Sequence, residues 1–234
     1  MRKRKTSIFS MLILALTVIT SLPAIKAEGA EEAVRSADSE NGEINFVHIV
    51  NQFWTRNNLS VTRYRNGDPI RHAKTAEEWL DAAAKGEGAW CYVSNDPHNR
   101  EKSGLLYNWY AVNDPRGVAP KGWHVPTLKE LKTLATSLGG HPVSNRDIHS
   151  PEALQWRYPH LGVERTVYFR AVPVGLRESH NAKFRLQGEN AVLWSSSEHA
   201  KNDSWSATFD FPASVITLDA LPKTAGASLR CVRD

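Results

Sequence analysis

The chain has 234 residues, 41% of them hydrophobic and 23% charged, proportions typical of a globular protein with one sizeable core. The whole sequence has a formal net charge of +4, but residues 1–27 hold five of the 29 basic residues and none of the 25 acidic ones. The rest carries 24 basic against 25 acidic residues, and this net charge of −1 excludes a domain that binds nucleic acid through excess positive charge.

Residues 1–27 have the three parts of a secretory signal peptide. Residues 2–5 are all basic, residues 8–19 form an apolar run, and Ala27 ends a stretch with small residues suited to cleavage. The run is short for a transmembrane span, which needs about 20 residues. We expect cleavage after Ala27 and no transmembrane segment afterwards. Because no Cys follows the apolar run, we expect an exported protein that is periplasmic, extracellular or on the cell surface and is not a lipoprotein.

The segment that follows differs in composition from both of its neighbours. Residues 28–43 are acidic and small and nearly lack large apolar groups, so they cannot bury enough surface to become ordered. We expect a flexible acidic spacer there and a single folded domain at 44–234. The β-branched and aromatic residues of 44–64 indicate strands, and Asn-Gly-Asp-Pro at 66–69 indicates a turn.

Two helices are expected from their terminal signals. Thr-Ala-Glu-Glu at 75–78 has the spacing of a capping box, and Lys-Gly at 85–86 ends that helix. Thr-Leu-Lys-Glu at 127–130 repeats the signal before a run of leucines spaced to lie on one face. Gly-Gly at 139–140 is expected to end the second helix through a left-handed cap.

The remaining elements are short. Residues 89–93 are expected to form a strand, and 105–112 a second apolar, aromatic segment. Residues 141–165 are polar and are expected to form a long excursion. From residue 167 onward, short stretches rich in β-formers alternate with turns, so two early helices and many late strands together predict an α+β fold.

Five motifs follow one another along the chain: GAWCYVSNDP at 88–97, LYNWYAV at 106–112, APKGWHVPT at 119–127, LWSSSE at 193–198 and SLRCVRD at 228–234. Together they resemble the Fibrobacter succinogenes major paralogous domain family of exported bacterial proteins. The resemblance implies a C-type-lectin-like fold, with small twisted antiparallel sheets, two helices and long loops. It implies no reaction, because relatives of that fold include glycan binders, receptor-binding proteins and an oxidising enzyme.

The chain has two cysteines, Cys91 and Cys231, and nine histidines. Export makes a disulfide chemically possible, and a bridge over so long a loop would stabilise the fold by roughly 5 kcal/mol in the chain-entropy model. We expect this disulfide; the alternative is two buried free thiols. The histidines lack the spacing of a metal site, so none is expected, and His124 is expected to be a hydrogen-bonded structural residue.

The stretch 198–205 contains the candidate ligand-binding residues. Trp205 lies among amide and carboxylate groups, where a partly exposed indole can stack on a sugar ring; the alternative is an inward-packing strand residue. Calcium is a possible ligand that we do not favour, because the tripeptides of calcium-dependent sugar-binding lectins are absent, and no cofactor is expected. The candidates are Glu198, His199, Asn202, Asp203 and Trp205. Other tryptophans are expected to pack in the core: Trp79, Trp90, Trp109, Trp123 and Trp194.

No catalytic motif surrounds the serines of 195–197, which we expect to form a polar turn or strand edge. We therefore expect a non-enzymatic, exported surface or binding domain that recognises glycan or protein on the cell envelope. One alternative is a structural subunit of an envelope assembly. Another is a polysaccharide-acting enzyme, which needs two carboxyls in one cleft. The available carboxyls are Glu164, Glu178, Glu189, Glu198, Asp203 and Asp210.

Overall fold

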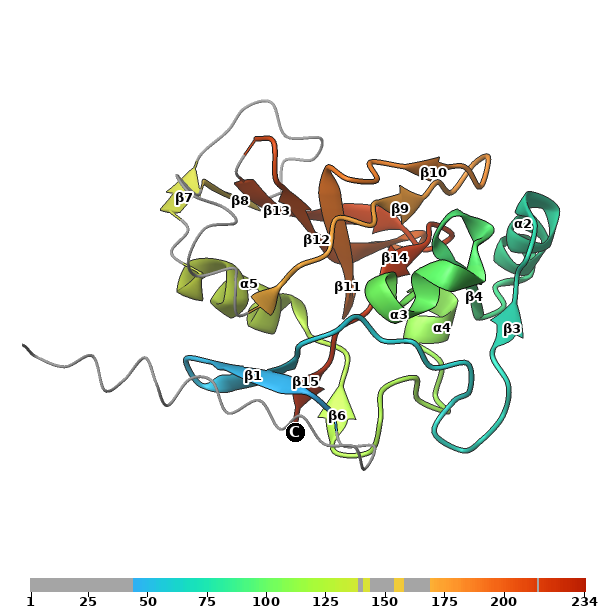
Figure 1. Cartoon of the computed structure of the whole chain (residues 1–234), viewed down its shortest axis with the longest axis horizontal. Helices are drawn as coiled ribbons and strands as arrows, with labels where there is room; N and C mark the ends of the chain where they lie inside the picture. The colour runs from blue at the N-terminus through green and yellow to red at the C-terminus, as the bar shows by residue number, and fades with distance from the viewer. Residues whose placement is uncertain (1–43, 139–140, 144–153, 158–168, 214) are drawn as a thin grey trace, which may run out of the picture.

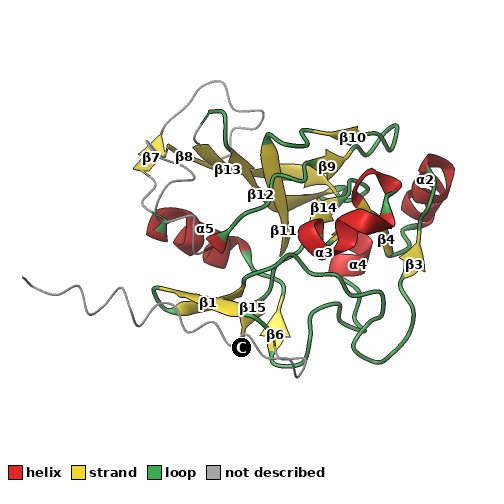
Figure 2. Ribbon diagram, in the orientation of Figure 1, coloured by secondary structure: helices red, strands yellow, loops and turns green. Residues whose placement is uncertain are grey.

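The computed structural model describes residues 44–138, 141–143, 154–157, 169–213 and 215–234, the second and third of these by their backbone alone. The expected signal peptide and spacer lie outside these residues. The described part has an α+β fold with a nine-stranded, a four-stranded and a two-stranded sheet (Figure 1, Figure 2), which confirms the expected class. Within it, no helix combines the length and the apolar character that crossing a membrane requires.

Most elements are short; the longest are the helices α2 and α5 and three strands near the end of the chain. The helices are α2 (Ala76–Lys85), η1 (Val93–Asn95), η2 (Pro97–Asn99), α3 (Arg100–Ser103), α4 (Trp109–Val112) and α5 (Leu128–Ser137). The first eight strands are β1 (Phe46–Ile49), β2 (Gln52–Thr55), β3 (Arg71–His72), β4 (Ala89–Tyr92), β5 (Leu105–Tyr107), β6 (Trp123–His124), β7 (His141–Val143) and β8 (Leu154–Arg157). The others are β9 (Leu176–Arg177), β10 (Phe184–Arg185), β11 (Asn190–Glu198), β12 (Asp203–Asp210), β13 (Val215–Pro222), β14 (Ala227–Ser228) and β15 (Val232–Arg233).

The large sheet has the order β3-β4-β5-β14-β11-β12-β13-β8-β7, with the antiparallel strands β11, β12 and β13 as its longest members. Two apolar layers cover its faces. Trp194 of β11 packs with Tyr107 and Trp109, whereas the preceding Leu193 packs with Leu131 of α5. Because successive side chains of a strand point to opposite faces, β11 separates these two layers.

The four-stranded sheet brings the two ends of the described domain together. Its order is β1-β2-β15-β6, and every neighbouring pair is antiparallel. Val232 of β15 pairs with Trp54 of β2 on one side and with His124 of β6 on the other. Trp54 is fully buried in the same apolar cluster as Leu131 and Leu134 of α5. This sheet therefore packs against α5 through Trp54 of β2.

Both expected helices are present. In α2 the Thr75 hydroxyl accepts from the amide of Glu78, and Gly86 ends the helix at a φ of 64° in the left-handed region that favours glycine. In α5 Thr127 and Glu130 form the complete, reciprocal capping box. The glycine pair expected to end α5 lies outside the described residues.

Two expectations for the middle of the chain need correction. The segment 105–112 is not one element, because the Asn108 side chain accepts from the amide of Ala111 and so begins α4 directly after β5. The expected excursion at 141–165 contains β7 and β8, which extend the large sheet beyond β13. Polar composition hid them, since strands at the end of a sheet need no continuous apolar pattern.

The expected disulfide is absent, and this prediction is wrong: Cys91 and Cys231 are free, buried thiols. Cys91 lies in the apolar cluster that holds Trp79, whereas Cys231 lies in the cluster that holds Tyr107 and Trp109. Burial raises the pKa of Cys91 to about 11 and that of Cys231 to about 12, so both remain protonated at neutral pH. The two cysteines act as small apolar residues in separate parts of the core.

Among the described residues two arginines are fully buried, and their guanidinium groups donate to backbone carbonyls and, for Arg230, also to the Asn58 side chain. Arg177 donates to the carbonyls of Ala182 at 3.0 Å and Thr75 at 2.8 Å, which ties β9 to the start of α2. Arg230 donates to Asn58 Oδ1 at 3.0 Å and to the carbonyl of Arg170 at 2.7 Å. The planar, multi-donor guanidinium thus joins segments that are distant in sequence.

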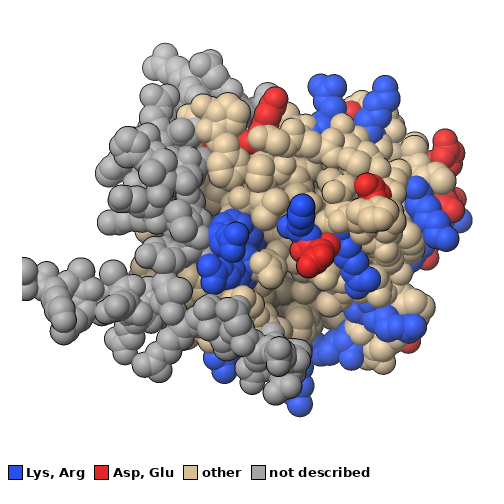
Figure 3. All heavy atoms as spheres, viewed as in Figure 1, with Lys and Arg blue, Asp and Glu red and all other residues tan. Residues whose placement is uncertain are grey.

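Charged side chains of both signs are mixed on the face shown in Figure 3. Arg71 illustrates the pairing, with Nη1 at 2.9 Å from Asp81 Oδ2 and 2.8 Å from Glu87 Oε2. Arg116 likewise contacts Asp114 at 2.8 Å. Such solvent-accessible pairs stabilise a fold little, but they keep opposite charges interspersed.

Candidate functional site

The five candidate residues come together on the hairpin that joins β11 to β12. Glu198 at the end of β11 pairs with Ser204 of β12. Between them the amides of His199 and Ala200 donate to the carbonyl of Asp203 at 3.1 and 3.0 Å. The amide of Asp203 donates back to the carbonyl of Ala200 at 3.2 Å. The turn is therefore short and closed by its own backbone.

Trp205 differs from the other tryptophans whose side chains are described. It is partly exposed, and its ring meets the His199 ring edge to face, with centroids 4.7 Å apart and planes at 83°. The remaining ones are all buried: Trp54, Trp79, Trp90, Trp109, Trp123 and Trp194. The five that were expected to pack in the core do so. Among the tryptophans whose side chains are described, Trp205 is therefore the one whose indole a ligand can reach.

Lys223 anchors this hairpin, although no sequence motif indicates this role. Its side chain is 7% exposed, and Nζ contacts Glu198 Oε1 and donates to the carbonyl of Lys201 at 2.8 Å. The ammonium also lies 4.5 Å from the centre of the Trp109 ring. Its backbone amide donates to the carbonyl of Asn202 at 2.9 Å. One residue therefore holds both sides of the turn against the aromatic centre of the domain.

The serines of 195–197 form a β-bulge, because β11 has three residues between Trp194 and Glu198 where β12 has one between Ser206 and Ser204. Ser195 Oγ donates to the carbonyl of Pro126 at 3.0 Å. Ser197 Oγ accepts from the amide of Leu128, the first residue of α5, at 2.9 Å. These bonds join the base of the hairpin to the start of α5 and account for the serines structurally.

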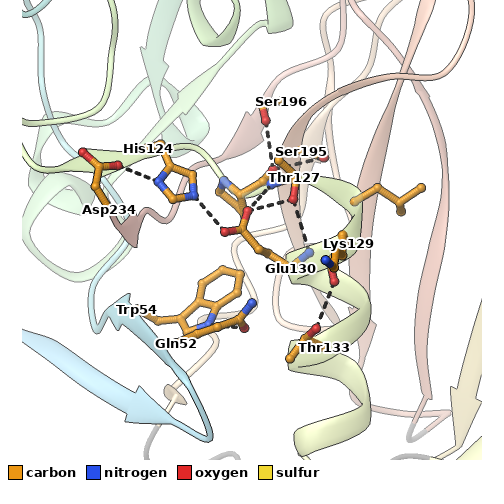
Figure 4. A network of polar contacts seen from close by, with 12 residues as sticks. Gln52, Trp54, His124, Thr127, Lys129, Glu130, Thr133, Ser195, Ser196 and Asp234 are labelled. Atoms are coloured by element: carbon orange, nitrogen blue, oxygen red, sulfur yellow. Dashed lines mark hydrogen bonds and ion pairs between the residues drawn. The ribbon is translucent and has the colours of Figure 1, made fainter.

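A second polar network lies at the start of α5, centred on His124 (Figure 4). His124 Nδ1 is 2.7 Å from Asp234 Oδ1, and His124 Nε2 is 2.8 Å from Glu130 Oε1. The other oxygen of Glu130 accepts from the amide and the hydroxyl of Thr127, both at 2.8 Å. The network thus connects β6, the residue after β15 and the first turn of α5, and it confirms that His124 is hydrogen bonded.

Comparison with protein families decides the relationship. The model of the Fibrobacter succinogenes major domain matches residues 47–233. The chain belongs to this family. No curated protein and no solved structure matches it. The motif that contains His124 lies inside the matched region, as does the motif that contains Trp109, the ring that Lys223 contacts.

In this major-domain protein the pKa values of His124 and Glu130 are shifted from their ordinary values. Burial opposes charging of His124, but hydrogen bonds to Asp234 and Glu130 outweigh it and raise the pKa of His124. Burial likewise opposes ionisation of Glu130, but the bonds from Thr127 and His124 outweigh it and lower its pKa. Both shifts favour the ion pair.

The carboxyl groups that the enzyme alternative would use come from several parts of this major-domain protein. Glu198 and Asp203 share the hairpin, whereas Glu178 pairs with Arg185 of β10 at 3.5 Å. Glu164 lies outside the described residues. Across the described residues, no group of three His, Cys, Asp or Glu side chains is arranged to hold a metal ion. The candidate site is therefore one aromatic and polar hairpin.

Proposed function

We propose that this major-domain protein is an exported, non-enzymatic recognition domain with a C-type-lectin-like fold, and that it binds envelope glycan at the β11–β12 hairpin. The observation that carries the proposal is the partly exposed Trp205 beside polar groups. Sugar rings stack on aromatic faces, and amide and carboxylate groups bind their hydroxyls. Asn202 and Glu198, both exposed, lie on the same hairpin.

The hairpin is suited to binding because it is held in place before any ligand arrives. His199 contacts one side of the Trp205 indole, which fixes its orientation and covers at most one of its two faces. Lys223 and the serine bulge hold the turn from below. A preformed surface loses little conformational entropy when a ligand binds, so more of the contact energy appears as affinity.

Export is supported by the signal-like sequence at 1–27, and the fold assignment by the ordered motifs and the two capped helices of an α+β domain. Calcium is not favoured as a ligand here. Asn202 and Asp203 supply three side-chain oxygens, whereas calcium takes six to eight oxygen ligands.

The test uses tryptophan fluorescence in a Trp156→Phe background, because the remaining tryptophans besides Trp205 are buried. Glycans and envelope fractions are titrated with calcium and with chelator. Binding that protects Trp205 from iodide quenching, and that Trp205→Ala weakens about tenfold or more, supports the proposal; tenfold corresponds to about 1.4 kcal/mol. Tyr92→Ala, which removes another partly buried aromatic on β4, serves as the control and should leave affinity unchanged.

Other outcomes separate the alternatives. Glycan affinity that is equal in Trp205→Ala and the parent would place binding elsewhere and reject the hairpin. Cleavage of a polysaccharide by the purified protein would replace the proposal with the enzyme alternative. Envelope partners that co-purify in fixed stoichiometry, without any glycan binding, would replace it with the assembly subunit.

A further inference from the structure

The contacts of His124 fix its protonation state. Both ring nitrogens are within 2.8 Å of carboxylate oxygens, Nδ1 at Asp234 and Nε2 at Glu130. A neutral imidazole has one N–H, so it can donate to only one of them and would point a lone pair at the other carboxylate. An ionised carboxylate only accepts hydrogen bonds. The observed geometry therefore requires the imidazolium, with one N–H for each carboxylate.

We propose that His124 is a proton-dependent clasp that fastens the first turn of α5 to the four-stranded sheet and opens when the imidazolium loses its proton. On the Asp234 side, backbone pairing already joins β6 and β15, and the amide of Asp234 donates to the carbonyl of Gly122 at 3.0 Å. On the Glu130 side, the imidazole is the direct polar link to α5. Loss of the proton leaves one N–H for two carboxylates and removes the positive charge, so it weakens the link to α5 while backbone pairing keeps the sheet intact.

Opening would reach the base of the hairpin. The first turn of α5 donates the Leu128 amide to Ser197, and the Pro126 carbonyl just before it accepts from the amide of Ser196 at 2.8 Å and the hydroxyl of Ser195 at 3.0 Å. These bonds are made by Pro126 and Leu128, in the segment that the clasp holds in place. The amides around Leu128 are therefore the place where opening can be observed, whether or not a ligand binds the hairpin.

The charges around His124 favour a closed clasp at mildly acidic pH. From α5, Glu130 faces the imidazole and Lys129 is the neighbouring cation; after β15, Asp234 faces it. Two further cations lie in the vicinity. Arg65 donates to the carbonyl of Trp123 at 3.2 Å, and Arg233 lies 5.9 Å from the Phe46 and Phe53 rings. Gln52 and Trp54 of β2, seen below the network in Figure 4, are uncharged.

The direction of the pH effect follows from the two shifted groups. The pKa of His124 is raised in the folded protein, so the clasp is fully closed below the ordinary histidine value of about 6.5 and opens as pH rises through the raised value. The pKa of Glu130 is lowered, so the clasp also fails as pH falls through that lowered value. The clasp is thus closed between the lowered pKa of Glu130 and the raised pKa of His124.

The test measures titration and local opening in the same protein. The Cε1–H resonance of His124, assigned by its loss in His124→Gln, is followed by NMR between pH 5 and 9, chosen to span about 6.5. Hydrogen exchange of the Leu128 to Leu131 amides, corrected for intrinsic rate, is followed over the same range. We expect His124 to titrate above about 6.5, and amide protection to fall about tenfold for each unit by which its pKa is raised.

Two variants sharpen the result. Asp234→Asn gives a neutral imidazole an amide donor at Nδ1, so it should lower the His124 pKa and flatten the exchange profile. Asp96→Asn is the matched control, because the exposed His98 ring contacts one carboxylate, with Nδ1 at 2.8 Å from Asp96 Oδ1; it should change neither readout. Titration of His124 at or below about 6.5, or α5 protection that does not vary with pH, would overturn the proposal.

Discussion

The hairpin anchor at Lys223 and the clasp at His124 solve the same problem with different groups. Each places a cationic side chain between segments far apart in sequence, and each contacts an acidic residue, Glu198 in one case and Glu130 in the other. The lysine side chain is buried and packs over Trp109, whereas the histidine side chain is 38% exposed. Loss of a proton leaves the histidine one N–H for its two carboxylate partners, so the strength of its joint depends on pH.

The largest effect should come from Lys223→Ala. It removes an aliphatic stem from the Trp109 ring, along with the bonds to Glu198 and the Lys201 carbonyl. We expect a loss of roughly 2–3 kcal/mol in the free energy of unfolding, measured by urea denaturation. Lys201→Ala is the control, since that exposed residue contributes its backbone carbonyl. A loss no larger than that of the control would show that the anchor is dispensable.

A smaller, pH-dependent effect is expected for Glu130→Gln. Glutamine also forms capping boxes, so the change removes the ion pair with His124 and keeps the helix start. Because both groups are partly exposed, we expect a loss of only about 1 kcal/mol at pH near 6 that shrinks as pH rises through the raised His124 pKa. Urea curves at both ends of the range measure it. An equal loss at every pH would contradict the clasp.

The smallest effects on stability are expected from substituting two adjacent serines, and the two costs should differ. Ser197→Ala removes the acceptor of the Leu128 amide, and we expect it to cost about 1 kcal/mol and to speed exchange of that amide. Ser196→Ala removes only a long contact of 3.4 Å to the Pro126 carbonyl, whose backbone partner remains. It should therefore change stability by less than about 0.5 kcal/mol. Equal costs for both serines would mean that the bulge is stabilised by its strand pairing alone.

How well a feature could be predicted from the sequence depended largely on how far apart in the chain its interacting residues lie. The capping signals at Thr75 and Thr127 act over three residues, so both helices were found. The split at Asn108 was missed although its cap is local, because its apolar surroundings resemble a continuous strand. Lys223 was missed for another reason: its partners on the hairpin are more than 20 residues away.

Predictions from composition were correct for tryptophan, whose environment the neighbouring residues indicate. They were wrong for cysteine, which has two usual environments in an exported chain. Tryptophans in apolar segments are buried, and Trp205 in its polar segment is partly exposed. A cysteine pair in an exported chain suits either a bridge or two thiols, and only the folded arrangement, with Cys91 and Cys231 in separate clusters, decides between them. The site residues were predicted as neighbours because they are close in sequence.

The two thiols provide the domain with built-in reporters of its own opening. A buried, protonated cysteine reacts with a maleimide or a disulfide reagent only when its surroundings part. Cys91 and Cys231 occupy different apolar clusters, so their modification rates would report two regions separately. Because neither cysteine is part of a disulfide, no oxidant is needed for the thiols to reach their native state, and a thiol reagent can report on them without an introduced label.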